Sequence, residues 1–275
     1  MSVLWGGDEL DLDAYFARIG YEGDRRPTAA VLRAVQRAHV TAIPWENLDM
    51  VLARPVDLAL EPLQAKLVRG GRGGTCSEHT TLFAAALDRL GFSFTGMQGR
   101  VRLGSTEIRP SSHNVLRVVA DDRVWLCDVG FGSSPLEPVE LADGAESTQD
   151  AWRYRLSSDA GEWVLHSWRD GRWLDVHAFT ETRRYPIDFA VTNHYMATHP
   201  RSLFHGRVMA QQMAANSLTV LENTRLTTHR PGEERVDVEL GVDEVVGALA
   251  DVFGVVLDEV DAKVVREVLS AHFNV

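Results

Sequence analysis

The sequence has only two cysteines in 275 residues, too few for the disulfide framework of a small secreted domain. It also lacks any run of about 18 apolar residues, so no segment predicts a transmembrane helix. The N-terminus has no basic region followed by an apolar stretch, and we expect no signal peptide. These absences predict a cytoplasmic protein with reduced thiols, which makes each cysteine a candidate nucleophile.

Positive charge is also scarce. The chain has 28 Lys and Arg against 39 Asp and Glu, a net charge of −11. Non-specific binding to a phosphate backbone needs an excess of cations, so we expect no nucleic-acid partner. An anionic small molecule can still be held by backbone N–H groups and a few well-placed cations. The length suggests two or three structural units around a sizeable core.

The first ninety residues have the periodicity of helices. Residues 11–20 carry an apolar stripe that ends at Gly20, and a second helix begins at Pro27-Thr28 and stops before Pro44. Beyond residue 92, short strands follow, at residues 115–119, 124–129, 152–156, 163–168 and 173–179. Consecutive antiparallel strands favour a barrel or a sandwich. After Pro186 the pattern is mixed, with helices expected at 243–254 and 262–273.

Cys76 follows a glycine-rich segment and starts a predicted helix. Thr75 and Glu78 have the spacing of a capping box, so Cys76 falls on the first helical turn. Unpaired N–H groups and the helix dipole favour a thiolate there. A buried structural thiol is the alternative for any cysteine, and it is the better interpretation of Cys127, which lies inside a strand. Cys76 is the candidate nucleophile.

A nucleophilic thiol needs a base and a group that orients the base. If Asp121-Asp122 forms the turn between two strands, paired positions sum to 243. His113 and Asp128 then share one face as diagonal neighbours, within side-chain reach. A slip of one residue would separate them. The order Cys76, His113, Asp128 is typical of a thiol-protease triad.

His79 is a competitor for this role, because it lies three residues beyond Cys76 on the same helix surface. The two residues could also begin a zinc site. Zinc would need two further ligands, and no second cluster of cysteine or histidine supplies them, so we expect no metal.

These residues resemble the motifs of the arylamine N-acetyltransferases. The matching segments appear in the family's order, from about Asp11 to Leu240: Tyr15-Phe-Ala-Arg-Ile-Gly20, Ile43-Pro-Trp-Glu-Asn-Leu48, Arg72-Gly-Gly-Thr-Cys-Ser-Glu-His79, His113, Asp128-Val-Gly-Phe-Gly132, and Thr198-His-Pro200 with Phe204. The combination of Arg-Gly-Gly-x-Cys with Asp-Val-Gly-Phe-Gly is specific, unlike a lone glycine motif.

The resemblance implies an α+β multidomain fold with a cysteine-protease-like triad arrangement. An N-terminal helical bundle, residues 1–92, would carry the nucleophile. A central antiparallel β-barrel, residues 93–190, would carry the histidine and aspartate, and residues 191–275 would form a C-terminal α/β lid.

The resemblance also implies a ping-pong reaction. Cys76 takes an acetyl group from acetyl-CoA as a thioester and passes it to the nitrogen of an arylamine or arylhydrazine, with His113 as base and Asp128 as its orienter. Three residues would border the thiol and CoA: Gly130, Phe131 and Gly132. Four would line the acceptor pocket: Trp45, Val101, Phe131 and Phe204.

Thr75 and Ser77 are smaller than the residues usual at these positions of the family. We expect them to leave space beside Cys76 for bulky acceptors, so that Ser77→Phe would narrow the acceptor range.

Two related functions stay open. An ansamycin-type amide synthase uses the same triad, but receives its acyl chain from an acyl carrier protein. A cysteine hydrolase would use water or a peptide. The remaining partner to consider is a second copy of the chain, in a homodimer.

Overall fold

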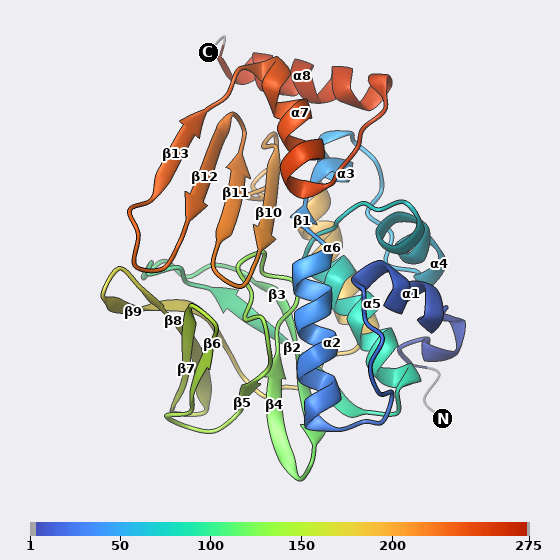
Figure 1. Ribbon diagram of the computed structural model, residues 1–275, viewed down its shortest axis with the longest axis vertical. Helices are drawn as coiled ribbons and strands as arrows, with labels where there is room; N and C mark the ends of the chain where they lie inside the picture. Colours follow the sequence, from blue (N-terminus) through green and yellow to red (C-terminus); the bar gives the residue numbers. More distant parts are fainter. Residues whose placement is uncertain (1–3, 274–275) are drawn as a thin grey trace.

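A computed structural model describes residues 4–273 of the chain (Figure 1). The N-terminal third is helical, as its periodicity predicts. Helix α1 starts where the Asp11 carboxylate accepts a hydrogen bond from the Ala14 N–H at 3.0 Å, and it ends at Gly20, whose φ is 67°. The segments of this part are η1 (Gly7–Glu9), α1 (Leu12–Ile19), α2 (Ala29–Ala42), α3 (Leu48–Val51), α4 (Leu60–Leu63), the π-helical η2 (Gln64–Arg69) and α5 (Cys76–Arg89).

The middle of the chain forms an antiparallel sheet of eight strands in the order β5-β4-β3-β2-β9-β8-β7-β6. Its edge strand β5 lies beside β6 and β7, so the sheet is a nearly closed barrel. The strands are β2 (Ser93–Val101), β3 (Ser111–Ala120), β4 (Arg123–Cys127), β5 (Val139–Glu140), β6 (Glu146–Gln149), β7 (Trp152–Asp159), β8 (Glu162–Arg169) and β9 (Arg172–Phe179).

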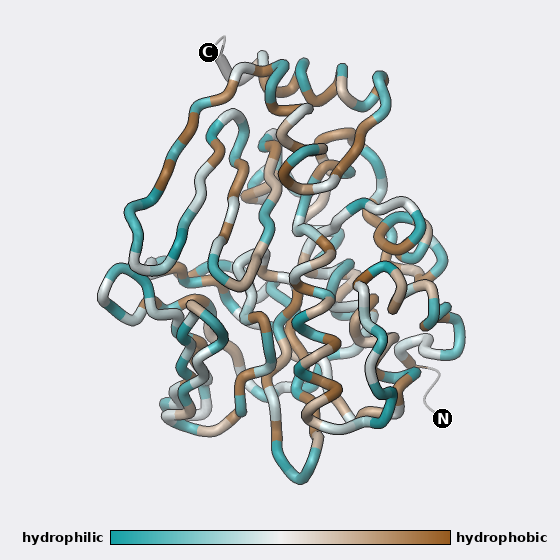
Figure 2. The backbone as a smooth tube through the Cα atoms, viewed as in Figure 1, coloured by the Kyte–Doolittle hydropathy of each residue, from teal (hydrophilic) through white to brown (hydrophobic). Residues whose placement is uncertain are grey.

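The hairpin of β3 and β4 has the predicted register. Val119 pairs with Val124 and Ala120 with Arg123, so paired positions sum to 243. Asp121 and Asp122 form the turn with φ of 51° and 58°, the left-handed values that a two-residue hairpin turn needs. The tip of this hairpin is hydrophilic and projects from the barrel (Figure 2).

The C-terminal part contains a second sheet, in the order β1-β10-β11-β12-β13. The resemblance implied an α/β unit here, but the residue pattern did not locate its strands. Helices α7 and α8 cross the end of this sheet (Figure 1). Its elements are β10 (Met209–Met213), β11 (Leu218–Glu222), β12 (Arg225–His229), β13 (Val236–Glu239), α7 (Val242–Phe253) and α8 (Glu259–Phe273), preceded by α6 (Pro186–Thr198).

The division of the chain at residues 92 and 190 stays a prediction. Two elements connect the parts that it would separate. Strand β1 (Trp45–Glu46) comes from the N-terminal part and pairs with β10. Helix α6 spans residue 190. The three parts are therefore joined by shared elements. Among residues 4–273, no helix is long and apolar enough to span a membrane.

Replacing Asp122 tests the turn that sets the β3–β4 register. Glycine tolerates a positive φ at no steric cost, so Asp122→Gly should raise the free energy of unfolding by up to about 1 kcal/mol. Asp122→Val should lower it by at least as much, because a β-branched residue is strained there. Urea unfolding of the two variants would measure this. Equal midpoints would show that the turn conformation does not limit stability.

Candidate active site

Cys76 is the first residue of α5, as predicted, and it is partly exposed. The backbone before it is fixed by close packing, since a Cβ on Gly73 would lie 2.1 Å from the Pro44 carbonyl oxygen. The Glu78 carboxylate accepts hydrogen bonds from the Thr75 N–H at 2.8 Å and from its hydroxyl at 3.2 Å. The N-terminus of α5 therefore reaches the thiol in one defined conformation.

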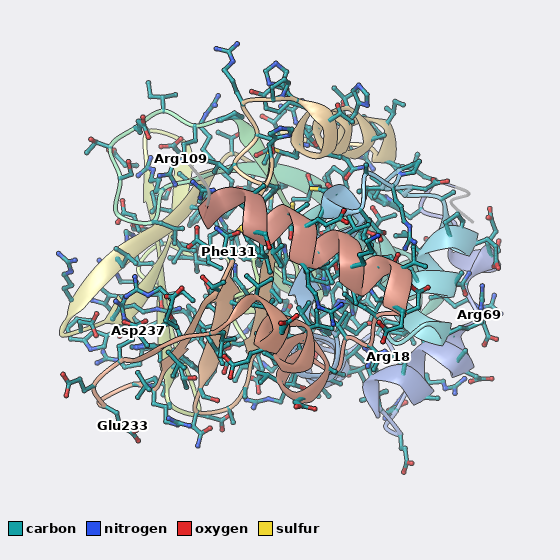
Figure 3. The ribbon with its side chains drawn as sticks, turned by 90° about the horizontal axis from the view of Figure 1, so that it is seen from above. Arg18, Arg69, Arg109, Phe131, Glu233 and Asp237 are labelled. Carbon is teal, nitrogen blue, oxygen red and sulfur yellow. The ribbon has the colours of Figure 1, made fainter. Side chains whose placement is uncertain are left out.

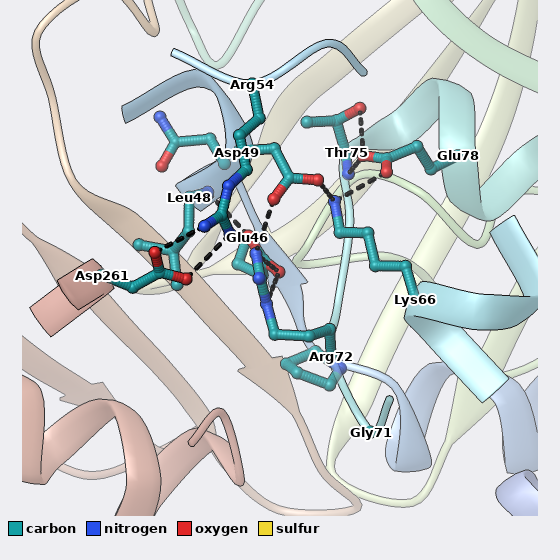
Figure 4. A network of polar contacts seen from close by, with 12 residues as sticks. Glu46, Leu48, Asp49, Arg54, Lys66, Gly71, Arg72, Thr75, Glu78 and Asp261 are labelled. Atoms are coloured by element: carbon teal, nitrogen blue, oxygen red, sulfur yellow. Dashed lines mark hydrogen bonds and ion pairs between the residues drawn. The ribbon is translucent and has the colours of Figure 1, made fainter. Parts of the chain in front are cut away.

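A buried network of charges fixes the segment that leads to Cys76 (Figure 4). The Lys66 ammonium lies 2.7 Å from Glu78 and 2.6 Å from Asp49. The Arg72 guanidinium lies 2.7 Å from Glu46 and 3.2 Å from Asp49. Burial opposes the charge of Lys66, but the surrounding carboxylates outweigh it and raise the pKa of Lys66. The network ties α5 and the glycine-rich segment to β1 and α3.

The structure brings the three predicted triad residues together. The His113 Nε2–H donates to Asp128 Oδ2 at 2.9 Å, and both side chains are buried. The Cys76 thiol lies 3.8 Å from the carbonyl oxygen of Ser112, the residue before His113. Because Nε2 is hydrogen-bonded to Asp128, Nδ1 is the ring nitrogen of His113 that can interact with the thiol.

Electrostatics favour a charged His113. Burial would lower its pKa, but the Asp128 charge and hydrogen bond and the interactions with Cys76 outweigh burial and raise the pKa of His113 to about 10. Burial would raise the pKa of Asp128, yet His113 and a second histidine lower it strongly. The arrangement thus supports an imidazolium between a carboxylate and a thiol.

The second histidine is His177 on β9, which the sequence analysis missed. Its Nε2 lies 2.9 Å from the same Asp128 Oδ2. No local pattern indicates this contact, because it depends on the pairing of β9 with β2, where Val101 lies opposite His177. His113, Asp128 and His177 form a group that could ligate a metal ion. Both histidines already bond directly to one oxygen, so the geometry fits a hydrogen-bonded cluster.

His79 does not compete for the thiol. Its Nδ1 bonds to His39 at 2.9 Å and its Nε2 donates to the Pro44 carbonyl at 3.1 Å. Both ring nitrogens are therefore occupied away from Cys76. Burial lowers the pKa of His79 to about 4, so it is a neutral structural residue. The Tyr15 hydroxyl, 2.8 Å from His39, completes this buried chain.

The residues predicted to border the thiol lie close to it. A Cβ on Gly130 would come within 2.7 Å of the Cys76 Cα. The Phe131 and His113 rings pack in an edge-to-face arrangement, with 4.9 Å between their centroids. Phe131 is partly buried and packs against the main core; its label lies in the middle of the view in Figure 3. Gly132 adopts a φ of 81° beside Gln211 of β10, which lets the chain turn away from the site.

The predicted acceptor residues approach from two sides. Trp45 forms a bridge with Gly74, two residues before Cys76, and its ring lies 5.2 Å from that of Phe204. Val101 lies opposite His177 on the other side, with Phe131. Of the four residues, Phe131 contacts His113 directly, Val101 pairs with the neighbouring His177, and Phe204 is linked to the site through Trp45.

The prediction for Thr75 and Ser77 is wrong. Both side chains are only 3% exposed. The Ser77 hydroxyl accepts a hydrogen bond from the Asn114 amide at 3.0 Å, on the face of α5 that packs against β3. Ser77 lies in the core, and its small size opens no space for an acceptor. A phenylalanine at this position would disrupt packing and would not reshape a pocket.

Two other features lie apart from Cys76. A cavity of about 590 Å³ lies between residues 55–59 and α6. On the barrel, His166 bonds to Ser157 at 2.7 Å through Nε2 and to Asp175 at 2.9 Å through Nδ1, the order of a serine-hydrolase triad. None of these three residues lines the 590 Å³ cavity, and we interpret the group as a cross-strand hydrogen-bond ladder.

Gly130→Ala should reduce activity at least tenfold while leaving most secondary structure intact. The added methyl would overlap Cys76 and shift the thiol from His113, and misplacement of about 1 Å costs rate steeply. Gly247→Ala is the matched control, since a Cβ there meets no atom within 4 Å. Specific activity and circular dichroism of both variants would test this. Full activity in Gly130→Ala would contradict the close approach.

Comparison with known proteins agrees with this geometry. A family model described as N-acetyltransferase matches residues 28–262. The arylamine N-acetyltransferase of Mycolicibacterium smegmatis is 35% identical over 266 residues, covering 94% of this chain and 96% of that one. The structure of the Mycobacterium abscessus arylamine N-acetyltransferase superposes with a TM-score of 0.94 at 42% identity, covering 98% of each chain.

A further structure, the arylamine N-acetyltransferase of Mycobacterium marinum in complex with CoA, superposes with a TM-score of 0.84 at 33% identity. It covers 95% of this chain and 97% of its own. The matches therefore span the helical part, the barrel and the C-terminal part. The chain belongs to the arylamine N-acetyltransferase family and is an enzyme of that type.

Proposed function

We propose that the chain transfers an acetyl group from acetyl-CoA, through a thioester on Cys76, to the nitrogen of an arylamine or arylhydrazine. The main support is the position of His113. It bonds to the buried Asp128 carboxylate and interacts with a thiol at a helix N-terminus. The name of the relatives and the CoA complex of one of them support the donor and acceptor classes.

In the first half-reaction the Cys76 thiolate attacks the acetyl carbonyl, and the His113 imidazolium gives its proton to the departing CoA sulfur. Cys76 is then a neutral thioester. His113, now neutral, takes a proton from the arylamine as its nitrogen attacks. The thiolate leaves, and the starting ion pair is restored. Asp128 stays ionised throughout and fixes the tautomer of His113.

We further propose that residues 191–275 act as the lid of the acceptor site, because Phe204 reaches Trp45 across it. Gly130, Phe131 and Gly132 would border the acyl group and CoA, and Val101 would face the acceptor. Both cysteines are free thiols, which supports a reducing cytoplasm. The amide-synthase alternative loses its particular support, because Ser77 does not widen the site.

Cys76→Ser should abolish acetyl transfer, whereas Cys127→Ser should keep most of it. A hydroxyl is a far weaker nucleophile than an activated thiol, and Cys127 is buried, with a raised pKa caused by burial and the nearby Asp128. Incubation with acetyl-CoA alone, followed by intact mass spectrometry, should show one added acetyl group on the Cys127→Ser protein and none on Cys76→Ser. Equal labelling of the two variants would refute Cys76 as nucleophile.

The same experiment separates the alternatives. A carrier-dependent amide synthase would not accept the acetyl group from free acetyl-CoA. A hydrolase would release acetate continuously without an amine, with no stable labelled form.

Removing the thiol should lower the pKa of His113. Cys76 contributes to the raised value of about 10 through a hydrogen bond and its charge. In Cys76→Ala the imidazolium should therefore lose its proton at a lower pH than in the wild type. Nuclear magnetic resonance of the His113 ring across pH 5–11 would measure both midpoints. Coincident midpoints would show that His113 and Cys76 do not form an ion pair.

A further inference from the structure

Asp128 accepts hydrogen bonds from two histidines, and the proposed reaction uses only one of them. His177 is fully buried and donates to the same carboxylate oxygen as His113. We propose that His177 is a positioning residue for the acetyl transfer: its Nε2–H holds the Asp128 carboxylate in the orientation that His113 requires. This inference rests on the proposed function of Cys76, His113 and Asp128.

The carboxylate has a complete set of donors. Its Oδ2 accepts from His113 and His177, each at 2.9 Å. Its Oδ1 accepts from the Gly130 N–H at 3.2 Å and from the Ser134 hydroxyl at 3.1 Å. An ionised carboxylate offers about four acceptor positions, so Asp128 cannot rotate without breaking hydrogen bonds. His177 is one of the two donors that fix Oδ2.

The tautomer of His177 follows from its surroundings. An ionised carboxylate only accepts, so His177 must carry its proton on Nε2. Its Nδ1 is buried and has no hydrogen-bond partner. A protonated His177 would therefore bury an unpaired N–H. Burial also lowers the pKa of His177 below its ordinary value, against the effect of Asp128. His177 is a neutral donor with one fixed tautomer.

The two histidines share one carboxylate, but only His113 takes the positive charge. The second nitrogen of His113 is directed to the Cys76 thiol, whose charge raises the pKa of His113. The His177 ring instead contacts the Phe131 and Phe179 rings, at 5.8 and 5.7 Å between centroids. His177 thus orients Asp128 without competing for the proton.

Two further ionisable groups, Tyr154 and Cys127, interact with the Asp128 charge and stay neutral. Burial raises the pKa of Tyr154 and of Cys127, and the Asp128 charge raises both further. Without His177, Oδ2 would keep one donor and gain an empty space beside it. The carboxylate could then swing away from His113, which would destabilise the imidazolium and raise the pH needed to form the thiolate.

Three substitutions separate a positioning role from a packing role. His177→Leu removes the donor. His177→Gln places an amide N–H the same number of bonds from Cα as Nε2, whereas His177→Asn places it one bond closer, out of reach of Oδ2. His166→Leu is the matched control, because His166 is another barrel histidine bonded to a carboxylate, Asp175. All variants carry Cys127→Ser, so that only Cys76 is alkylated.

Two readouts are needed: steady-state kinetics with acetyl-CoA and aniline, and the pH dependence of Cys76 alkylation by iodoacetamide. We expect His177→Leu and His177→Asn to lower kcat/KM by roughly 10- to 100-fold, the effect of one buried hydrogen bond to a charged group. The acid limb of alkylation should move to higher pH, because a less stable imidazolium stabilises the thiolate less. His177→Gln should recover most of both, and His166→Leu should match the parent.

The inference is overturned if His177→Gln is as impaired as His177→Leu, or if activity falls while the alkylation profile stays in place or moves to lower pH. Circular dichroism identifies any variant that fails to fold, and the glutamine–asparagine pair then carries the comparison. Failure of the proposed function looks different. In that case Cys76→Ser still transfers acetyl groups, whatever the histidine variants do.

Discussion

One buried negative charge organises the centre of this protein. Moving an isolated carboxylate out of water costs several kcal/mol even after relaxation, and Asp128 is only 1% exposed. The surrounding structure offsets that cost with four donors from three segments: one from β3, one from β9, and a backbone N–H and a serine hydroxyl from the segment that follows β4. The pairing of β9 with β2 must therefore be in place before the aspartate is fully hydrogen-bonded. The geometry around Asp128 thus depends on the assembly of β2, β3, β4 and β9.

On the other side of the thiol, the charge network before α5 also compensates buried carboxylates, here with cations. Glu46, Asp49 and Glu78 are paired with Lys66 and Arg72 within a few ångströms. In a chain of net charge −11, these cations are placed where they link separate segments. Buried pairs of this kind contribute little net stability, but removing one partner is costly. Their effect here is to fix where α5 begins.

Local patterns predicted the parts of the site that depend on local structure. The cap at Thr75 and Glu78 placed Cys76, and the Asp121-Asp122 turn set the register that brings His113 to Asp128. His177 could not be found this way, because its position depends on a pairing between strands more than seventy residues apart in the sequence. The strands of the second sheet were not located because they are short and mix polar with apolar residues, and every residue of β13 is exposed. Ser77 was misassigned because periodicity does not identify which neighbour a helix face packs against.

Strand β1 has a consequence for the order in which the site is completed. Trp45 and Glu46 pair with Gln211 and Ala210, so one wall of the proposed acceptor site rests on residues made long after the nucleophile. During synthesis, Cys76 leaves the ribosome well before this partner strand exists. A nascent chain can bury its helices and close its barrel, yet it lacks the strand against which Trp45 is held. The thiol therefore acquires the proposed substrate site only after β10 (Met209–Met213) has been made, which limits acylation of shorter nascent chains.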